Sequence, residues 1–268
     1  MGHLIIAGSG IKAGAHMTLE TKSWIESADV VLYLAAEPVT EHQIRSLNQN
    51  TKSLFECYRD RENRFTAYRR MIDAALQAVE EYPLVCVVFY GHPGVFVYPS
   101  FRMMQEARRR GHLARMLPAI SADSCLYADL EIDPARDGCQ SFEATDFLVH
   151  DRQFDSRSLL ILWQIGMLCD ASFRASSYAN EKMAILVDML CRFYPKNHRV
   201  IVYEGAQFAL CEPKIHYCEL RNLTVAPISP GSTLVVLPAR RESVKASRLK
   251  ELGLTREDIM IEPELRSL

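Results

Sequence analysis

Short β-rich apolar runs alternate with helical patterns through the first 120 residues, and this alternation limits the fold more than any other feature. The runs HLIIAG (3–8), DVVLYL (29–34), KSLF (52–55) and LVCVVFY (84–90) predict strands. Helical periodicity fills the intervals between them, most clearly at 61–82, where apolar residues recur on one stripe. Strands and helices in regular succession are typical of a mostly parallel sheet covered by helices. We therefore predict an α/β fold.

The pattern changes beyond residue 140, where strand candidates outnumber helices. ATDFLV, SLLILWQIG, HRVIVYEGA and STLVVLPA predict four strands, and a single long helical pattern lies among them, at residues 176–194. This arrangement favours a second domain of the α+β class. We therefore predict an N-terminal domain over 1–120, a second domain over 121–240 and a helical tail over 241–268, with a short amphipathic helix near 244–252.

Composition argues against several classes of partner. The net charge is −2, so we expect no broad basic surface for nucleic acid or an anionic membrane. No apolar run is long enough to span a membrane, and the start, MGHLIIAGSG, lacks the basic region of a signal peptide. The eight cysteines are scattered without zinc-binding spacing, which predicts reduced core thiols and no metal site. Together these features predict a cytoplasmic protein.

Glycine-rich loops at strand ends are the main functional signal. The first, GSGIKAGAH (8–16), has GxGxxxG spacing, which is weak evidence for a dinucleotide. Gly8 and Gly10 either allow the backbone to pass close to a ligand or simply form a tight turn. The loop YGHPGV (90–95) ends a buried strand at the edge where open α/β sheets bind ligands. We expect it to line a pocket, although a lone histidine such as His92 is more often structural.

Further strand-end loops repeat this signal in both halves of the chain. PAISADS (118–124) predicts a helix that begins near Ala122 with Ser121 as its N-cap, and free amides at such a position favour a carboxylate. WQIG, YEGA and GST mark strand ends in the second half. Tyr90 and His92 add a hydroxyl and a titratable ring. The loops together predict one cleft that holds an elongated ligand with a carboxylate, a ribose and a base.

These motifs carry a resemblance to a known family. MGHLIIAGSG, YGHPGVF, MLPAISA and GSTL resemble the tetrapyrrole methylase superfamily, two-domain enzymes that bind S-adenosylmethionine (SAM) between their domains. HMTLET, YGHPGVFV, ADLxxDP, WQIG and YxxxxxRxxxY more closely resemble the borosin peptide-backbone α-N-methyltransferases, over residues 3 to about 238. Tetrapyrrole methylases usually carry an acidic residue where this chain has His92, which favours the borosin branch. The resemblance implies a tetrapyrrole-methylase-like fold with a SAM cleft between two α/β domains.

The resemblance also implies which residues bind the cofactor, with S-adenosylhomocysteine (SAH) as product. To the glycines Gly8 and Gly10 of the first loop it adds a set of SAM contacts drawn from the later loops. They are Tyr90, His92, Val95, Ser121, Ala122, Gln164, Gly205, Ser232 and Thr233.

The same resemblance implies a catalytic trio, Tyr58, Arg64 and Tyr68, with Tyr90 helping to position SAM and the amide. A peptide nitrogen is a poor nucleophile because resonance commits its lone pair to the carbonyl. A tyrosine has a pKa of about 10, and an adjacent guanidinium favours its phenolate, which can remove the amide proton. Arg64 and the other hydroxyl can stabilise the amide oxygen. We favour Tyr68 as the base and Tyr58 as the hydrogen-bond donor, but which tyrosine has which role stays open. The structural alternative is that Tyr68 belongs to the apolar stripe of its helix and that Arg64 is a surface charge, which is what periodicity alone predicts.

Fungal borosin enzymes carry their substrate as a C-terminal extension. Residues 240–268 are instead charged, with no apolar stretch that resembles a core peptide, and they resemble the end of bacterial split enzymes. We therefore expect a separately encoded precursor peptide and a homodimer that forms a heterotetramer with two precursors. Two alternatives remain: a tetrapyrrole C-methyltransferase, or a SAM-binding module without turnover.

Overall fold

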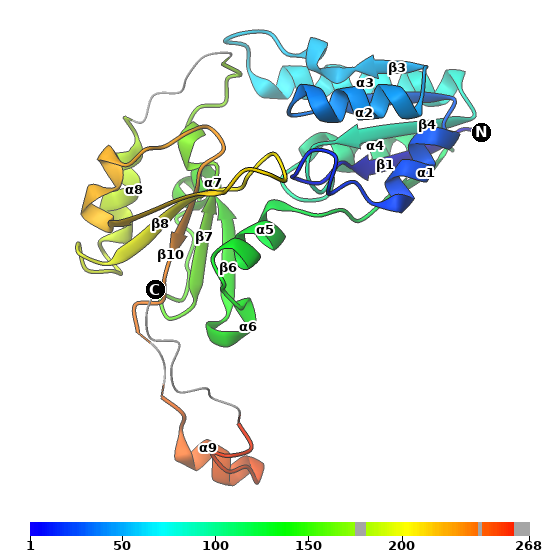
Figure 1. The fold of residues 1–268 in the computed structure, drawn as a ribbon. Helices are drawn as coiled ribbons and strands as arrows, with labels where there is room; N and C mark the ends of the chain where they lie inside the picture. The colour runs from blue at the N-terminus through cyan, green and yellow to red at the C-terminus, as the bar shows by residue number, and fades with distance from the viewer. Residues whose placement is uncertain (175–180, 241–242, 260–268) are drawn as a thin grey trace.

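The computed structural model describes residues 1–174, 181–240 and 243–259. Within them the chain forms two five-stranded sheets with helices packed against them, which confirms the predicted α/β class (Figure 1). The first sheet ends at Met116 and the second begins at Cys139. One sheet thus lies on each side of residue 120, but the domain divisions at 120 and 240 stay predictions.

The strands of the first sheet follow the order β3-β2-β4-β1-β5 and are all parallel. Parallel neighbours place all their carboxyl ends at one edge, so the loops that follow the strands gather there. The strands are β1 (His3–Gly8), β2 (Val30–Leu34), β3 (Thr51–Ser53), β4 (Leu84–Phe89) and β5 (Leu113–Met116).

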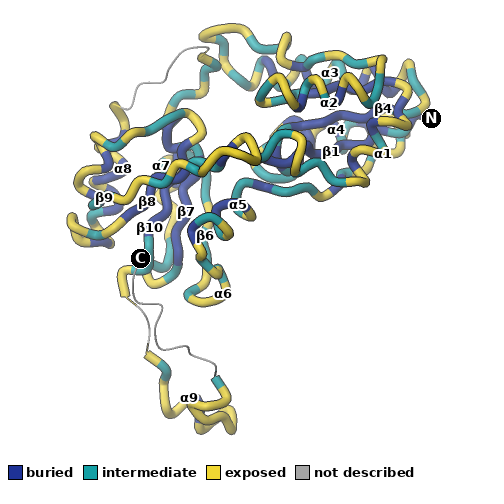
Figure 2. Tube along the Cα trace, viewed as in Figure 1, coloured by how far each residue is buried: buried dark blue, intermediate teal, exposed yellow. Residues whose placement is uncertain are grey.

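Helices cover both faces of this sheet. Side chains alternate along each strand, so Leu4 and Ile6 of β1 pack toward α3 and α4, while Ile5 and Ala7 pack toward α1 and α2. Each fully buried aliphatic side chain contributes about 1.5–3 kcal/mol. Figure 2 shows the central strands β1 and β4 of this sheet as mostly buried, whereas the edge strands β3 and β5 are exposed or half-buried. The helical segments are α1 (Leu19–Ser27), α2 (Pro38–Leu47), the short 3-10 helix η1 (Leu54–Cys57), α3 (Arg64–Glu81) and α4 (Tyr98–Arg109).

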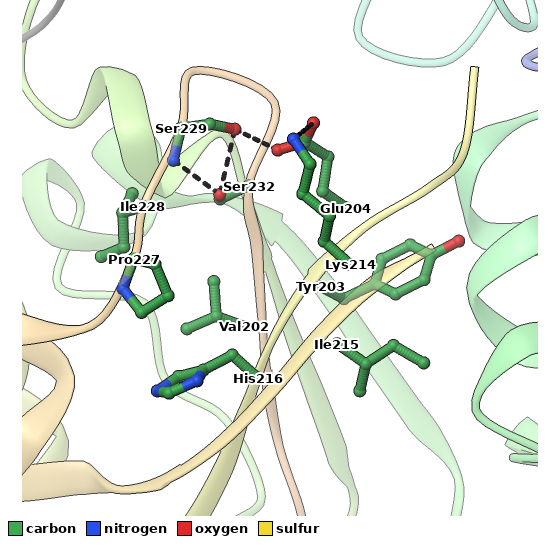
Figure 3. A pocket seen from close by; sticks show the side chains of 10 residues that line it. All are labelled: Val202, Tyr203, Glu204, Lys214, Ile215, His216, Pro227, Ile228, Ser229 and Ser232. Carbon is green, nitrogen blue, oxygen red and sulfur yellow. Dashed lines mark hydrogen bonds and ion pairs between the residues drawn. The ribbon is translucent and has the colours of Figure 1, made fainter. Parts of the chain in front are cut away.

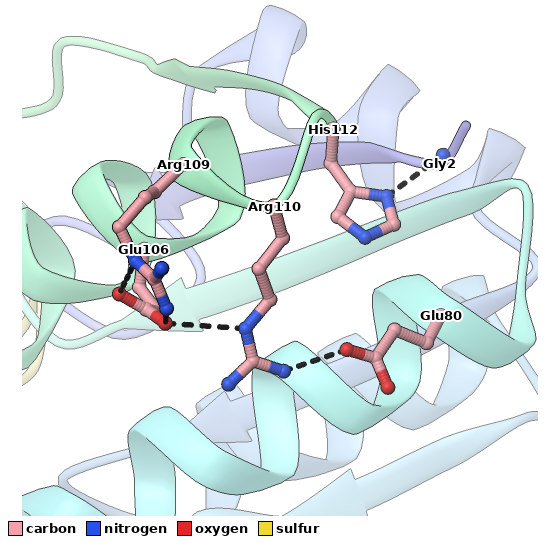
Figure 4. A network of polar contacts seen from close by, with 6 residues as sticks. All are labelled: Gly2, Glu80, Glu106, Arg109, Arg110 and His112. Atoms are coloured by element: carbon pink, nitrogen blue, oxygen red, sulfur yellow. Dashed lines mark hydrogen bonds and ion pairs between the residues drawn. The ribbon is translucent and has the colours of Figure 1, made fainter.

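Polar contacts link the two helices of one face. Arg110, just after α4, donates to Glu80 of α3 at 2.6 Å and to Glu106 of α4 at 3.2 Å (Figure 4). His112 accepts a hydrogen bond from the backbone N–H of Gly2 at 3.0 Å. Exposed ion pairs individually contribute little to stability. Apolar packing therefore sets the positions of α3 and α4, and the polar contacts only align the ends of the two helices.

The second sheet has the order β6-β7-β10-β8-β9. Its β6 and β7 run parallel, whereas the other neighbours are antiparallel. The strands are β6 (Cys139–Glu143), β7 (Leu159–Trp163), β8 (Arg199–Glu204), β9 (Lys214–Glu219) and β10 (Thr233–Val236). One face packs on α7 and α8 and the other on α5. The remaining segments are α5 (Ala122–Asp129), α6 (Pro134–Asp137), α7 (Ala144–Val149), η2 (Ile165–Met167), α8 (Met183–Leu190), η3 (Leu220–Val225) and α9 (Ala246–Leu252).

Several sequence expectations for the second half were wrong in detail. Residues 144–149 form helix α7, not a strand, because the Glu143 carboxylate accepts from the Asp146 amide and caps a helix start. The strand β6 precedes it at 139–143, and the edge strand β9 was missed. The helix expected over 176–194 is shorter in the structure. Only Met183–Leu190 are helical as α8, residues 181–182 and 191–194 form turns and a bend, and residues 175–180 lie outside the described residues.

The cysteines are all free, as expected, but only Cys86 and Cys125 are buried. Cys169 and Cys211 are exposed, so the prediction that the cysteines are core thiols is wrong for these two. No helix within the described residues is both long and apolar enough to cross a membrane. The described residues also contain no group of three or more histidine, cysteine, aspartate or glutamate side chains placed to hold a metal ion.

Candidate functional site

A cavity of about 610 Å³ lies where the strand-end loops of the two sheets meet. The loop after β4 forms one side together with Ile11, which follows β1. The start of α5, the ends of β7 and β8 and the turn at 229–233 form the other sides. The structure brings together eight of the predicted cofactor residues on its walls. These are Tyr90, His92, Val95, Ser121, Ala122, Gln164, Gly205 and Thr233.

Gly8 and Gly10 do not line the cavity. A Cβ on Gly8 would lie 2.1 Å from the carbonyl oxygen of Gly91, so only glycine allows the loops after β1 and β4 to pack so closely. Gly10 has a φ of +73° and forms an isolated bridge with Gly91. The structure therefore gives both glycines a supporting role behind the cavity wall, and direct contact with a ligand stays a prediction.

Tyr90 and His92 present different chemistry to the cavity. Burial raises the pKa of Tyr90 to about 12, so its hydroxyl stays protonated at neutral pH and acts as a hydrogen-bond donor. The Nδ1 atom of His92 accepts from the Gly94 amide at 2.9 Å, which leaves Nε2 as the protonated nitrogen of the neutral ring. Both side chains are thus suited to donate a hydrogen bond.

Ser121 precedes α5 as predicted, but its hydroxyl does not cap the helix. It donates instead to the carboxylate of Asp123, and that carboxylate also accepts from the Ser124 amide at 2.7 Å. Ser121 and Ala122 nevertheless line the cavity at the positive end of the helix dipole. Sequence reasoning missed Asp123, although an acidic residue in the first turn of a helix is a recognisable signal.

Glu204, to which sequence reasoning gave no role, lines both this cavity and a neighbouring pocket of about 460 Å³ (Figure 3). It accepts from Lys214 Nζ at 2.8 Å and from the hydroxyl of Ser229. Burial would raise the pKa of Glu204, but these two hydrogen bonds outweigh it and lower the pKa below its usual range. The cavity therefore contains an ionised carboxylate.

Ser232 lines that neighbouring pocket rather than the main cavity. Its side chain is buried, and its hydroxyl accepts from the Ser229 amide at 2.9 Å. This contact shapes the turn before Thr233, which does line the main cavity. A role for Ser232 as a direct cofactor contact stays a prediction.

The predicted catalytic residues other than Tyr90 gather beside the cavity rather than on its wall. The rings of Tyr58 and Tyr68 meet edge to face with centroids 6.5 Å apart. Arg70 holds the segment before α3 by donating to the Cys57 carbonyl at 2.8 Å and to the Glu62 carboxylate. The cluster is partly buried, and Tyr68 packs against the core of the first sheet, as its place on the apolar stripe predicts. A catalytic role for these residues stays a prediction.

Arg64 connects this cluster to the cavity. It is the first residue of α3, and its guanidinium donates to Met167 Sδ at 3.2 Å and to the Asp170 carbonyl at 2.7 Å. Met167 also lines the cavity. Arg64 and Tyr68 lie one helical turn apart, as predicted, but the side-chain hydrogen bonds of Arg64 go to Met167 and Asp170 and not to Tyr68.

Comparison with known proteins gives the family. The model of the tetrapyrrole (corrin/porphyrin) methylases matches residues 3–209. The chain belongs to this family of methyltransferases. Members of the family use SAM as methyl donor.

Curated relatives of this methylase come from fungi. It is 39% identical over 255 residues to the methyltransferase and cyclic peptide dendrothelin A precursor of Dendrothele bispora, and 38% identical over 257 residues to the corresponding omphalotin A precursor of Omphalotus olearius. A type III borosin precursor of Anomoporia bombycina is 40% identical over 257 residues. Each match covers 94% of the chain, but the chain spans only 61%, 62% and 30% of these relatives.

Solved structures show the same fold. Uroporphyrin-III C-methyltransferase of Thermus thermophilus superposes with a TM-score of 0.64 at 15% identity, covering 96% of this methylase and 99% of that chain. Diphthine synthase superposes with a TM-score of 0.61 at 14% identity, covering 96% and 98% of the two chains. At such low identity these structures establish the two-sheet architecture and not the substrate.

Proposed function

We propose that this protein is a SAM-dependent α-N-methyltransferase that acts on backbone amides of a ribosomal precursor peptide. The observation that carries the proposal is the position of Tyr58, Tyr68 and Arg64 beside the cavity, with Met167 shared between Arg64 and the cavity wall. Relatives 38–40% identical over most of the chain are named as methyltransferases and cyclic peptide precursors in one, which supports the same reaction here.

The cavity suits the methyl donor in size and chemistry. Its volume of about 610 Å³ lies in the range of small-molecule sites. The carboxylate of Glu204 suits hydroxyl or ammonium groups, and the start of α5 at Ser121 and Ala122 suits a carboxylate. Tyr90 and Trp163 provide aromatic surface. When bound, SAM supplies an electrophilic methyl group that must lie in line with the acceptor nitrogen.

The residues of the chain activate the acceptor amide. One tyrosine of the pair Tyr58 and Tyr68, as its phenolate, would take the amide proton, and the other would donate to the amide oxygen as negative charge grows there. The nitrogen would then form its bond to the methyl group as the bond from that group to sulfur breaks, which leaves SAH. Arg64, permanently charged, stabilises that charge from the same side. Tyr90 is held neutral by its raised pKa of about 12, so it serves as a donor that positions the reactants and not as the base.

We further propose that the peptide is a separately encoded precursor and that two copies of the enzyme bind two precursors in a cytoplasmic heterotetramer. The relatives named above combine both parts in one chain. Residues 243–259 are rich in charged side chains, include the helix α9 and do not resemble an apolar core segment. Light scattering of the enzyme with and without precursor tests this assembly.

Tetrapyrrole C-methylation is the second candidate, favoured by the fold. Such substrates carry several carboxylates and need cations to bind them. Among the described residues that line the cavity there is no lysine or arginine, and its carboxylate, Glu204, is already paired with Lys214. These features disfavour an anionic macrocycle. A SAM-binding module without turnover would account for the cavity but leaves the tyrosine and arginine cluster beside it without a purpose.

Coexpression tests the proposed reaction. The enzyme is produced with the product of a short open reading frame beside its gene, and the peptide is analysed by tandem mass spectrometry. The proposal predicts added methyl groups located on backbone nitrogens. An unmodified peptide, or methyl groups on side chains only, contradicts it. A bound coloured tetrapyrrole in the purified enzyme supports the second candidate instead.

A further inference from the structure

We propose that the segment from Met167 to Phe173, here called the strap, is a positioning element of the active site. It belongs to the half of the chain that forms the second sheet, yet it reaches the start of α3 and holds Arg64 and Tyr58 beside the cavity. The strap thereby sets the catalytic groups of the first half of the chain against a cavity whose walls come from both halves.

Backbone pairing fixes the strap to the segment before α3. Phe173 exchanges hydrogen bonds with two residues there: its N–H donates to the Glu62 carbonyl at 2.8 Å, and its carbonyl accepts from the Arg61 N–H at 2.7 Å. The carbonyl of Ala171 accepts from the Arg64 N–H at 2.8 Å. The Arg64 N–H lies in the first turn of α3, where backbone N–H groups have no hydrogen-bond acceptor within the helix. The strap therefore provides an acceptor for this N–H.

Side chains and a strap carbonyl complete the attachment at two of the proposed catalytic residues. The ring of Phe173 stacks on Tyr58 with centroids 4.5 Å apart and planes 23° from parallel. The guanidinium of Arg64 lies between Met167 Sδ and the Asp170 carbonyl, at 3.2 and 2.7 Å. The strap thus limits the directions available to both the hydroxyl of Tyr58 and the charge of Arg64.

The strap is itself held in shape by contacts within its own domain. The carboxylate of Asp170 accepts from the Ser172 amide at 2.8 Å, from the Ser172 hydroxyl at 2.6 Å and from Arg174 Nε at 2.6 Å. The Cys169 amide donates to the Thr145 hydroxyl at 3.0 Å. At its other end, Met167 lines the cavity. A short continuous stretch therefore joins the cavity wall to the catalytic cluster.

A positioning role predicts a specific kinetic effect, and it presupposes the methyl transfer proposed above. Phe173→Leu keeps most of the side-chain volume but removes the ring that stacks on Tyr58. Because misplacing a catalytic group lowers turnover more than binding, we expect kcat to fall about 10-fold to 100-fold. The KM for peptide and the Kd for SAH, measured by calorimetry, should stay within about twofold, and Phe173→Tyr should restore turnover.

A matched control separates this effect from a general loss of aromatic packing. Phe193 is 48% exposed and its ring lies 4.8 Å from that of Phe154, on the second sheet's helical face. Phe193→Leu removes a comparable contact away from the trio and should leave kcat unchanged. Equal kcat in wild type and Phe173→Leu overturns the inference.

A second measurement needs no turnover. In protein labelled with 3-fluorotyrosine, the Tyr58 signal is assigned by its disappearance in Tyr58→Phe. Loss of the stacked ring should shift this signal in Phe173→Leu and not in Phe193→Leu; an unmoved signal overturns the inference. If the wild type methylates no peptide, the proposed function fails. The shift of the fluorine signal in Phe173→Leu then still tests whether the strap positions Tyr58. If the wild type is active, an unaffected Phe173→Leu contradicts the strap alone.

Discussion

Gly10 and Gly91 exchange two backbone hydrogen bonds across the carboxyl ends of β1 and β4, with N···O distances of 3.2 and 3.0 Å. Both have φ values above +70°, a conformation that side chains other than glycine rarely adopt. Gly8 packs against the same carbonyl of Gly91. The two glycine-rich loops of the sequence are therefore one unit, and the wall that carries Tyr90 and His92 is supported from behind.

Replacing Gly8 by alanine should disrupt this support. The new Cβ would lie 2.1 Å from the Gly91 carbonyl oxygen, and such overpacking costs about 1–3 kcal/mol. Chemical denaturation should show this loss. Gly231→Ala is the control, because the nearest atom to a Cβ there is 3.6 Å away, and its stability should match wild type. Equal stability of the two variants contradicts the close packing of the loops.

Tyr90→Phe tests whether this hydroxyl is a donor or the base. Because burial raises the pKa of Tyr90 to about 12, its proton stays on below that pH and it cannot remove the amide proton. We expect kcat to fall by about 10-fold, as for the loss of one hydrogen bond, while the pH dependence of kcat keeps its shape. Disappearance of an ascending limb between pH 7 and 10 would instead identify Tyr90 as the base.

Glu204→Gln should weaken binding of SAH. The lowered pKa of Glu204 keeps it ionised, and a hydrogen bond to a charged group contributes about 1.5–3 kcal/mol, or roughly 10-fold to 100-fold in Kd. Glu212→Gln, at an exposed position outside the cavity, is the control. Titration calorimetry of both variants measures the effect. An unchanged Kd for Glu204→Gln would exclude this carboxylate from the donor site.

Asp170→Asn should loosen the strap in a pH-dependent manner. Burial would raise the pKa of Asp170, but hydrogen bonds from Ser172 and Arg174 lower it to about 2 from an ordinary 3.8. A carboxyl group whose pKa is lower in the folded state than in the unfolded state stabilises the fold at pH values above its unfolded-state pKa. That stabilisation is lost as the pH falls through the folded-state pKa. The stability difference between wild type and variant should be constant above about pH 5 and narrow toward pH 3. A difference independent of pH contradicts the ionised Asp170.

The sequence predicted the centre of the first sheet well because its strands β1, β2 and β4 are buried on both faces. Apolar runs such as 84–90 allow no other interpretation when helices flank them. Edge strands lack this signal. In β9 every residue is exposed or half-buried, so no buried apolar run marks Lys214–Glu219 as a strand. The helix α7 was misread because a capping carboxylate, Glu143, decided its conformation.

The candidate site could be predicted where a sequence motif lies in a loop whose position follows from the parallel sheet. Tyr90 and His92 line the cavity because a loop that follows a parallel strand must lie at that edge. The strap could not be predicted, since pairing between Phe173 and Glu62 joins segments more than 100 residues apart without a local pattern. Glu204 was also left without a role, because its charge state depends on Lys214 and Ser229, which the fold brings to it.

The central claim is that Tyr58, Arg64 and Tyr68 activate a backbone amide beside the donor cavity. The most direct measurement compares methyl incorporation into the coexpressed precursor by wild type and by a variant with Tyr58→Phe, Tyr68→Phe and Arg64→Ala combined. We predict that the rate falls by at least about 1,000-fold while SAH affinity is retained, because general base and oxyanion stabilisation are lost together. Methylation of backbone nitrogens at the wild-type rate by the folded triple variant would contradict the account.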